Sequence, residues 1–268
     1  MFYPGLEGKN VLAIGGNSNL GQHISRLFAQ SGANVVIAAQ DVDHAKKIAD
    51  DINALHKGKV SVVDIDATSF PSVENAVAEV QKLGSLDIVY QGIAWDVFGS
   101  FLELDPAFWD KIYEVNLKSV MIMYRTVLPI MIAQRSGSIV TMGSVLGRVP
   151  APTWEPVYGA MKAGVMHLAR AIATDVAEYG VRVNVVAPGA TPPVSPDALD
   201  KFSTYRNFMS DPAKMEAVGR EFLSHIPLNR FGTPENVAHA VLYLASPVTG
   251  GFQTGQILGV DGGQFMPY

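Results

Sequence analysis

The stretch Val11-Leu12-Ala13-Ile14-Gly15-Gly16-Asn17-Ser18-Asn19-Leu20-Gly21 decides the fold of this chain. An apolar run ends in glycines, and Leu20, Ile24 and Phe28 then recur at helical spacing up to Gly32. This order predicts a strand, a glycine-rich turn and a helix. Backbone N–H groups at the start of such a helix can approach a pyrophosphate, and the helix dipole favours negative charge there. The stretch also fits a plain tight turn between a strand and a helix.

Further short apolar runs alternate with helical segments along the rest of the chain. They predict strands over 35–38, 60–64, 86–90, 137–142 and 181–186, and a last strand and turn over 255–263. Helix starts are expected at Asp105-Pro106 and Thr233-Pro234, where a capping side chain precedes a proline. Because no linker, repeat or low-complexity segment divides the chain, we expect one α/β domain over residues 1–268.

Composition excludes several classes of function. The net charge of -5, without a run of Lys or Arg, argues against nucleic acid or an anionic membrane as the main partner and favours small molecules. With no cysteine there is no disulfide or thiolate nucleophile, and the six scattered histidines predict no metal site. The N-terminus lacks a leader pattern and no apolar run reaches the ~18 residues of a membrane span. We therefore expect a soluble, cytoplasmic protein.

The stretch Tyr158-Gly-Ala-Met-Lys162 carries the predicted chemistry. On a helix, positions i and i+4 share a face, so the Lys162 ammonium can lie near the Tyr158 phenol and favour its ionised form. A phenol needs a shift of roughly 3 pKa units, or ~4 kcal/mol, to act near neutrality. Taken alone, the pattern also fits an ordinary helix.

A serine precedes this stretch by fourteen positions, at the end of the predicted strand 137–142. A loop of that length can bring Ser144 beside the phenol, so that both hydroxyls hydrogen-bond one substrate oxygen. A nucleophilic serine is the competing interpretation. The segment is Gly-Ser-x-x-Gly rather than the Gly-x-Ser-x-Gly elbow of hydrolases, and no downstream Asp/His pair is evident.

Several motifs occur in the order and at the spacings of the short-chain dehydrogenase/reductase family, which the chain resembles over nearly its whole length. They are the glycine turn, Asp64, Asn116, Ser144, Tyr158, Lys162 and Pro188-Gly189. The resemblance implies a doubly wound Rossmann-type fold of seven mostly parallel strands, ordered 3-2-1-4-5-6-7, with three helices on each face.

The resemblance also implies roles for the catalytic residues. Tyr158 shuttles a proton to or from the substrate oxygen, which Ser144 orients. Lys162 binds the nicotinamide ribose and lowers the pKa of Tyr158. Asn116, through a local helix distortion, completes a proton relay to solvent.

The implied NAD(P) site depends on further positions. Asn19 stands where the family has its middle glycine, and asparagine tolerates left-handed backbone angles, so we expect the turn to survive. The family's acidic NAD position is Ala39, which removes a repulsion against phosphate and favours NADP while leaving NAD open. The coenzyme-binding residues implied by the resemblance are Gly15, Asn17, Ser18, Asn19, Leu20, Gly21, Ala39, Gln40, Asp64, Ile65, Gly92, Tyr158, Lys162, Pro188, Gly189 and Thr191.

Two departures from the family pattern affect this site. Gln91-Gly92-Ile93-Ala94 replaces the usual Asn-Asn-Ala-Gly, which alters the amides that brace the strands. The positions that carry basic residues in NADP-dependent members are Ser18 and Gln40 here. These departures keep open a non-catalytic, dinucleotide-binding regulatory protein of the same fold.

A substrate lid is expected over about 190–230, and it is rich in aromatic residues. With neighbouring loops it suggests an apolar pocket for a ketone or secondary alcohol, although the same side chains also fit a role in anchoring lid helices. The predicted lining residues are Trp95, Phe98, Leu146, Trp154, Phe202 and Tyr205.

A second substrate class remains open, a carrier-linked 3-oxoacyl thioester. Its carrier phosphate would need a basic entrance, for which Arg148 and Arg206 are the candidates. The family commonly uses its terminal region as an interface, so we expect a homo-oligomer, a tetramer or a dimer.

Overall fold

The computed structural model describes residues 3–55, 59–150 and 155–266, and it contains one seven-stranded sheet. The strand order is β3-β2-β1-β4-β5-β6-β7, and all six neighbouring pairs are parallel. The expected strand order is thus confirmed. The strands are β1 (Asn10–Ile14), β2 (Asn34–Ala39), β3 (Val60–Asp64), β4 (Ile88–Gln91), β5 (Gly137–Met142), β6 (Val181–Pro188) and β7 (Ile257–Val260).

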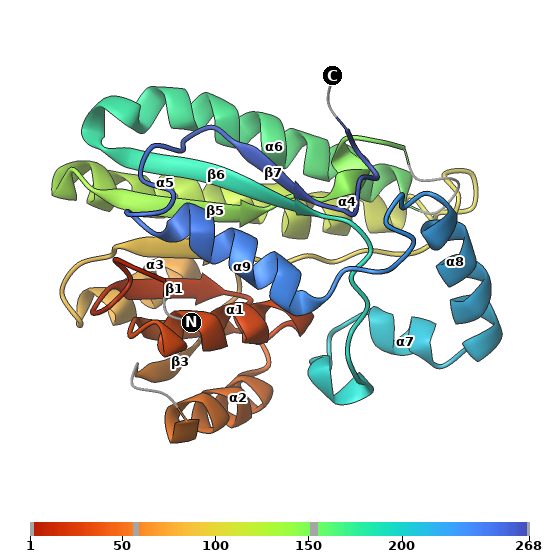
Figure 1. Ribbon diagram of the computed structural model, residues 1–268, viewed down its shortest axis with the longest axis horizontal. Helices are drawn as coiled ribbons and strands as arrows, with labels where there is room; N and C mark the ends of the chain where they lie inside the picture. Colours follow the sequence, from red (N-terminus) through yellow and green to blue (C-terminus); the bar gives the residue numbers. More distant parts are fainter. Residues whose placement is uncertain (1–2, 56–58, 151–154, 267–268) are drawn as a thin grey trace.

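Helices cover both faces of this sheet (Figure 1). One layer consists of α1 (Asn19–Gln30), α2 (Val42–Leu55) and α9 (Pro234–Ala245). The opposite layer consists of α3 (Phe70–Gln81), α5 (Ser119–Gln134) and α6 (Pro156–Val176). The central strands are buried on both faces, which explains why they read as continuous apolar runs rather than alternating ones.

Both predicted helix starts are confirmed to within two residues, but of the two predicted caps only Thr233 caps its helix, since Pro106 takes the N-cap position of α4. Thr233 and Asn236 form a reciprocal capping box at the start of α9. Asp105 accepts a hydrogen bond of 2.9 Å from the N–H of Ala107, where α4 (Ala107–Tyr113) begins. The helix predicted from Tyr158 begins two residues earlier, and Gly180 ends its last turn at φ +72°.

The helical run Ala107–Gln134 comprises α4, a π-helical turn and α5. It has 28 residues and contains an 18-residue window with a mean hydropathy of 1.3, so it satisfies the length and composition of a membrane span. The side chains of Met123, Tyr124, Val127 and Met131 are almost completely buried and join the core beneath the sheet. We therefore assign this run to the core of the domain.

The predicted lid is a chain excursion between β6 and α9. It contains η4 (Pro196–Ala198), α7 (Tyr205–Met209) and α8 (Pro212–Ser224), and the two helices lie together beyond one end of the sheet (Figure 1). The Gln22 side chain on α1 donates to the carbonyl of Ala198 at 3.1 Å. The lid therefore contacts the half of the domain that holds the glycine turn.

Candidate active site

The glycine turn requires glycine for steric reasons. Gly15 has φ +74°, and a Cβ on Gly21 would lie 2.0 Å from the carbonyl oxygen of Gly15. The Ser18 hydroxyl caps α1 by accepting from the N–H of Gly21 at 3.1 Å. This turn therefore lets the backbone of residues 15–21 come close to a ligand at the N-terminus of α1.

Asn19 does not adopt the left-handed backbone angles that its place in the turn suggested. Asn19 is the first residue of α1 and has no positive φ, because Gly15 supplies the left-handed angle of the turn. Its side-chain nitrogen instead donates to the carbonyl of Thr191 at 3.3 Å, which ties the turn to the segment after β6. Its side-chain oxygen is buried and has no partner. A buried acceptor left open beside a glycine turn fits a ligand that brings a donor, such as a ribose hydroxyl of a dinucleotide.

The predicted adenosine positions lie side by side at the ends of β2 and β3, where Ala39 pairs in register with Asp64. Ala39 is buried, whereas Gln40 and Asp64 are exposed, and the next residue on each strand, Asp41 or Ile65, is buried. The Asp41 carboxylate accepts from the N–H of Lys201 at 3.1 Å, and the Lys201 Nζ lies 3.6 Å away. The lid thus supplies a cation next to the expected ribose site.

At the predicted nicotinamide end, hydrogen bonds join the ends of β4 and β1 and the ends of β6 and β7. Gly92 donates its N–H to Ile14 at 2.9 Å, and Gly189, which follows Pro188 at the end of β6, donates to Val260 at 3.0 Å. The Thr191 hydroxyl donates to the carbonyl of Gly189 at 3.1 Å. A Cβ on Gly92 would lie 2.0 Å from the Tyr90 hydroxyl, so this position admits only glycine.

The altered amide after β4 still braces the core. The Gln91 Nε2 donates to the Ser119 hydroxyl at 3.3 Å, which links β4 to α5. The Gln91 Oε1 is buried without a partner. Glutamine at position 91 therefore still braces β4 against α5. It also leaves a second buried acceptor, after the one of Asn19, without a partner where the strands end.

The three residues predicted for proton transfer come together. A 3₁₀ turn, η2 (Val145–Gly147), packs closely on α6 because a Cβ on Gly147 or Gly159 would meet the opposing backbone at 2.7 or 2.8 Å. This approach places the Ser144 hydroxyl in hydrogen-bonding contact with Tyr158. The Lys162 Nζ lies 5.5 Å from the centre of the Tyr158 ring and donates to the carbonyl of Met142 at 2.9 Å.

Asn116 lies in the π-helical turn η1 (Glu114–Lys118), so the predicted helix distortion is confirmed. Its side chain is fully buried. The Nδ2 donates to the carbonyls of Trp95 at 2.5 Å and Ile112 at 2.9 Å, and the Oδ1 accepts from the N–H of Trp95 at 3.3 Å. The amide therefore holds the loop after β4 in place.

The electrostatics at the phenol differ from the sequence-based expectation. Burial lowers the pKa of Lys162 to about 8, and the charge of Asp96 opposes this shift. Burial raises the pKa of Tyr158 well above its ordinary value, the charges of Glu155, Asp96 and Tyr205 add to the rise, and the Ser144 hydrogen bond counteracts it. The prediction that Lys162 makes this phenol acidic is therefore wrong for the chain by itself.

Two carboxyl groups at the site were missed by sequence reasoning. Burial raises the pKa of Asp96 to about 6, and Glu155, whose side chain meets it, lowers it. Burial and the charge of Asp96 raise the pKa of Glu155 well above its ordinary value. The signals that were available are the place of Glu155, three residues before Tyr158, and of Asp96, four residues after Gly92.

The structure describes five of the six predicted pocket residues. The Phe98 and Tyr205 rings meet edge to face at 5.6 Å, and Trp95 lies 5.9 Å from Phe108. Leu146 lies on η2 beside Ser144 and donates its N–H to that hydroxyl. Phe202 is 48% exposed, with the Lys201 Nζ 5.2 Å from its ring, so it belongs to the lid segment beside α2. Trp154 lies outside the described residues.

Comparisons with known proteins agree with this geometry. A family model described as enoyl-(acyl carrier protein) reductase matches residues 14–264. The 3-oxoacyl-(acyl-carrier-protein) reductase FabG of Thermotoga maritima is 36% identical over 267 residues, covering 96% of this chain and 98% of that protein. The acetoacetyl-CoA reductase of a Synechocystis strain is 34% identical, covering 98% of each chain.

A solved structure agrees over the same length. A short-chain type dehydrogenase/reductase from Mycobacterium marinum superposes with a TM-score of 0.85 at 28% identity, covering 98% of this chain and 97% of the other. Since the family model and relatives of more than 30% identity span nearly the whole sequence, this chain belongs to the short-chain dehydrogenase/reductase family and is an NAD(P)-dependent oxidoreductase of CH–OH and C=O groups.

Proposed function

We propose that this enzyme reduces a small, largely apolar ketone to a secondary alcohol, with Tyr158 as the proton donor. The proposal depends on the surroundings of the Tyr158 phenol. Ser144 forms a hydrogen bond with this phenol, and Lys162 lies one helical turn away. The glycine turn lies at the same edge of the sheet, where the strands end. The coenzyme supplies the hydride in this direction. The phenol proton goes to the substrate oxygen, and the carbonyl carbon becomes CH–OH.

The electrostatics keep Tyr158 in its protonated form, which reduction requires. Burial and the neighbouring carboxyl groups raise its pKa, so loss of the proton depends on groups that stabilise the phenolate. The Ser144 hydroxyl holds the same substrate oxygen and orients it. The Lys162 ammonium, with a pKa lowered to about 8 by burial, stabilises the phenolate that remains after transfer.

Return of a proton to Tyr158 is proposed to run past Lys162 toward the π-helical turn. The Asn116 side chain is occupied by Trp95 and Ile112, so it positions this region and does not itself carry the proton. We retain Asn116 in the site in that positioning role.

A 3-oxoacyl thioester is the second candidate substrate, because two of the relatives described above are named for 3-oxoacyl and acetoacetyl reduction. The candidate basic entrance does not favour it. The Arg148 guanidinium donates to the carbonyl of Ile257 at 2.5 Å and stacks on Phe265 at 4.8 Å. Arg206 donates to the carbonyls of Asp200 and Leu199. Rates with acetoacetyl-CoA and with small cyclic ketones distinguish the two classes.

We propose NADP as the preferred coenzyme. Position 39 has no carboxylate, and the neighbouring Asp41 is already bound by Lys201 and by the N–H of His44 at 3.3 Å. Its negative charge is therefore offset by a lid lysine, which favours a 2′-phosphate at this place. Dissociation constants for NADP and NAD, measured by calorimetry, test the preference.

We propose that the chain forms a homo-oligomer. An apolar depression of about 450 Å³ lies between α4 and α6, lined by Phe101, Trp109, Tyr113 and neighbouring residues. Leu102 beside it is 95% exposed. Apolar side chains in such number on one surface are typical of an interface. Location in the cytoplasm stays a prediction.

Replacement of the phenol tests the proposed function. Tyr158→Phe should lower the rate of ketone reduction by about 10³-fold, since proton transfer by a positioned group contributes that order of rate. Coenzyme binding should change less than about threefold, because the hydroxyl is not needed to hold it. A variant that reduces ketones at the rate of the parent protein would contradict the assignment.

A further inference from the structure

We propose that residues 191–201 of the lid form a strap across the coenzyme groove, and that Asp41 and His44 fasten this strap and thereby set the rate of coenzyme exchange. The strap lies between β6 and α7 and contains η4. The inference rests on the proposed NADP-dependent reduction and adds two positioning residues to its coenzyme site.

Two side chains fasten the strap to the start of α2. The Asp41 carboxylate accepts from the N–H of Lys201 at 3.1 Å, and the His44 Nε2 donates to the carbonyl of Asp197 at 3.3 Å. Asp41 is 6% exposed, so its bond to the strap is shielded from water. Because Asp41 directly follows Gln40, these anchors lie beside the expected adenosine ribose.

A second set of contacts fastens the strap to the start of α1. The Asn19 Nδ2 donates to the carbonyl of Thr191 at 3.3 Å, and the Gln22 Nε2 donates to the carbonyl of Ala198 at 3.1 Å. The pyrophosphate is expected at this end of α1. The strap therefore joins the turn between β1 and α1 to the turn between β2 and α2. A coenzyme held by both turns has the strap as a wall.

The strap is a stiff segment that side chains hold in place. Its residues 191–196 include three prolines, which fix φ and lack a backbone N–H. In the part of the chain that the structure describes, no backbone–backbone hydrogen bond joins residues 191–201 to the sheet, to α1 or to α2. A stiff segment with side-chain anchors can detach and return as a unit. The anchors therefore control how often it opens.

The fastened strap is also favoured by packing. Ala198 and Leu199 are 6% and 4% exposed, so lifting this part of the strap from α1 exposes apolar surface. The Arg206 guanidinium donates to the carbonyls of Leu199 and Asp200, which ties the end of the strap to α7. We expect the open state to be rare, so that its formation limits the exchange of coenzyme.

Two rival interpretations predict different results. If the contacts only stabilise the lid, loss of an anchor lowers the melting temperature and leaves coenzyme exchange unchanged. If Asp41 acts only through its charge, its neutralisation slows release of reduced NADP, because a negative charge weakens the binding of a nearby phosphate. The strap predicts the opposite result for Asp41, which is faster release.

The rate of release of reduced NADP tests the two anchors. It is measured by stopped-flow displacement, with coenzyme fluorescence as the signal and no ketone present. Asp41→Asn keeps the shape of the side chain that caps α2 and weakens its bond to the strap. We expect release to become about tenfold faster in Asp41→Asn and about threefold faster in His44→Ala, since bonds to charged groups are the stronger ones.

Association and a lid control complete this measurement. In His44→Ala the association rate constant should rise in parallel, because the anchor is the same in the free and the bound protein. The dissociation constant should then stay within about threefold of the parent value. The exposed pair of Glu216 and Arg220 lies within α8 of the same lid. Glu216→Gln removes this pair and should leave both rate constants unchanged.

A cross-link closes the strap without an added charge. Because the chain has no cysteine, His44→Cys and Asp197→Cys together provide the only two thiols. A short bis-maleimide joins them across the gap that the His44 ring spans in the structure. The same variant blocked with N-ethylmaleimide is the control. We expect release from the cross-linked protein to be about tenfold slower or more. If the cross-link does not form, the two substitutions carry the test.

Unchanged or slower release in both substitutions, or equal release from the cross-linked and the blocked protein, overturns the proposal. A lower melting temperature with unchanged exchange does so as well, since it identifies a purely structural contact. Failure of the parent protein to bind reduced NADP rejects the coenzyme preference instead, and the strap is then tested with reduced NAD. Since no ketone is present, a parent protein that exchanges coenzyme as expected but reduces no ketone rejects only the proposed function.

Discussion

A buried cation and a partly buried one lie at the two edges of the sheet where its strands end and begin, and the protein surrounds them differently. Lys162, at the edge where the strands end, is 1% exposed, and among the residues that the structure describes its one hydrogen bond goes to the Met142 carbonyl. Arg182, at the edge where the strands begin, donates to Ser138 and to the carbonyls of Leu244, Ala245, Gly250 and Gln253. Burial lowers the pKa of both groups. The arginine is satisfied by the protein, whereas the lysine retains donors for a ligand.

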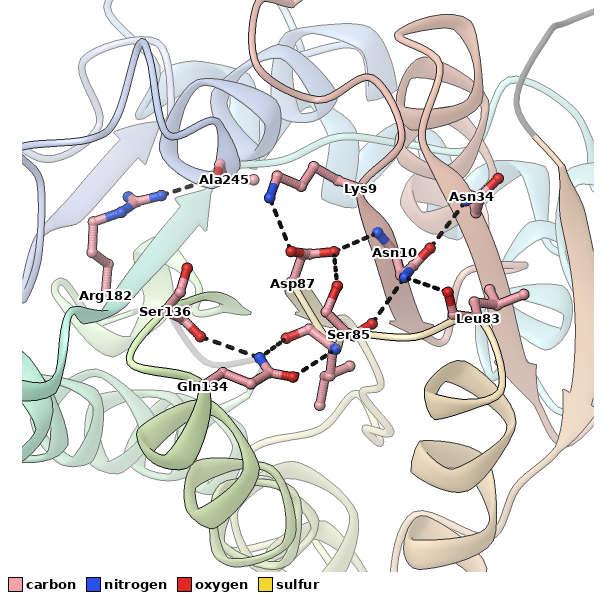
Figure 2. Close-up of polar contacts among 11 residues, drawn as sticks. Lys9, Asn10, Asn34, Leu83, Ser85, Asp87, Gln134, Ser136, Arg182 and Ala245 are labelled. Carbon is pink, nitrogen blue, oxygen red and sulfur yellow. Dashed lines mark hydrogen bonds and ion pairs between the residues drawn. The ribbon is translucent and has the colours of Figure 1, made fainter.

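The same contrast extends to the neighbours of each cation. At the edge where strands begin, Asp87 accepts from Lys9, from the N–H of Asn10 and from Ser85 (Figure 2). At the opposite edge, one buried side-chain oxygen each of Asn19, Gln91, Asp261 and Gln264 has no hydrogen-bond partner in the part of the chain that the structure describes. Buried polar groups are normally satisfied, so this distribution separates a stabilising edge from a ligand-binding edge.

Removing the charge of Lys162 should produce the largest effect. Lys162→Met is expected to lower turnover by about 10³-fold. It should also raise the free energy of unfolding at pH 7 by about 1 to 3 kcal/mol, because a buried ammonium is no longer desolvated. Chemical denaturation and steady-state rates measure both effects.

The difference in free energy of unfolding between the parent protein and Lys162→Met should change with pH in one direction. The folded pKa of Lys162 is about 8 and its ordinary value is 10.5, so the unfolded chain binds more protons between those values. The parent protein should therefore become more stable relative to Lys162→Met as the pH rises from 8 to 10.5. A difference that stays constant over this range would show that desolvation of Lys162 is not its cause.

The matched change at the other edge should have the opposite consequences. Arg182→Met removes the donor that several carbonyls share, and should lower the free energy of unfolding by about 3 kcal/mol. Turnover per folded molecule should stay within about twofold, since Arg182 lies where β6 begins and the proposed catalytic residues lie where the strands end. A loss of turnover with unchanged stability would contradict the claim that Arg182 stabilises the fold and does not act in catalysis.

Asp96→Asn should stabilise the protein at neutral pH. The folded pKa of Asp96 is about 6, above its ordinary value of 3.8, so the folded state binds more protons between pH 4 and 6. The parent protein loses stability as the pH rises through that window, and the variant does not. We expect a gain of about 1 to 2 kcal/mol above pH 6 that vanishes below pH 4. Denaturation curves at pH 4 and pH 7 measure the gain, and equal differences at both would contradict it.

Asp87→Asn should have a smaller effect of opposite sign. Burial acts to raise the pKa of Asp87, but its hydrogen bonds and Lys9 outweigh burial and hold it below the ordinary value. The stabilisation is therefore complete at neutral pH and is lost as the pH falls below the usual aspartate range. The variant should lose about 1 kcal/mol at pH 7. Urea denaturation of both proteins at pH 7 and pH 3 measures this, and the difference should shrink at the lower pH.

The strands and helix starts could be predicted from the sequence, because they depend on local patterns. Continuous apolar runs identified the strands, and the Asp105-Pro106 and Thr233-Pro234 pairs identified helix starts to within two residues. The spacing from Ser144 to Lys162 predicted residues that the fold brings together. These features need only periodicity, turn chemistry and the geometry of one helix.

The electrostatics of the site could not be predicted in the same way. Asp96 and Glu155 are separated by 59 positions, and their contact depends on the path of the β4 loop over α6. The role of Asn19 likewise depends on Thr191, which approaches only after β6 crosses the sheet. Burial and charge at Tyr158 are sums over such distant groups, so the effect of Lys162 alone gave the wrong direction.

Hydrogen–deuterium exchange with and without NADP tests the division between the two edges most directly. We predict slower exchange in the glycine turn 15–21, the loop 91–96 and the segment 189–201, which lie at the ends of the strands. Exchange should be unchanged around Lys9, Asp87 and Arg182, where the polar groups are already satisfied. Protection that appears first at the Arg182 edge, or no protection at all at saturating coenzyme, would contradict the account.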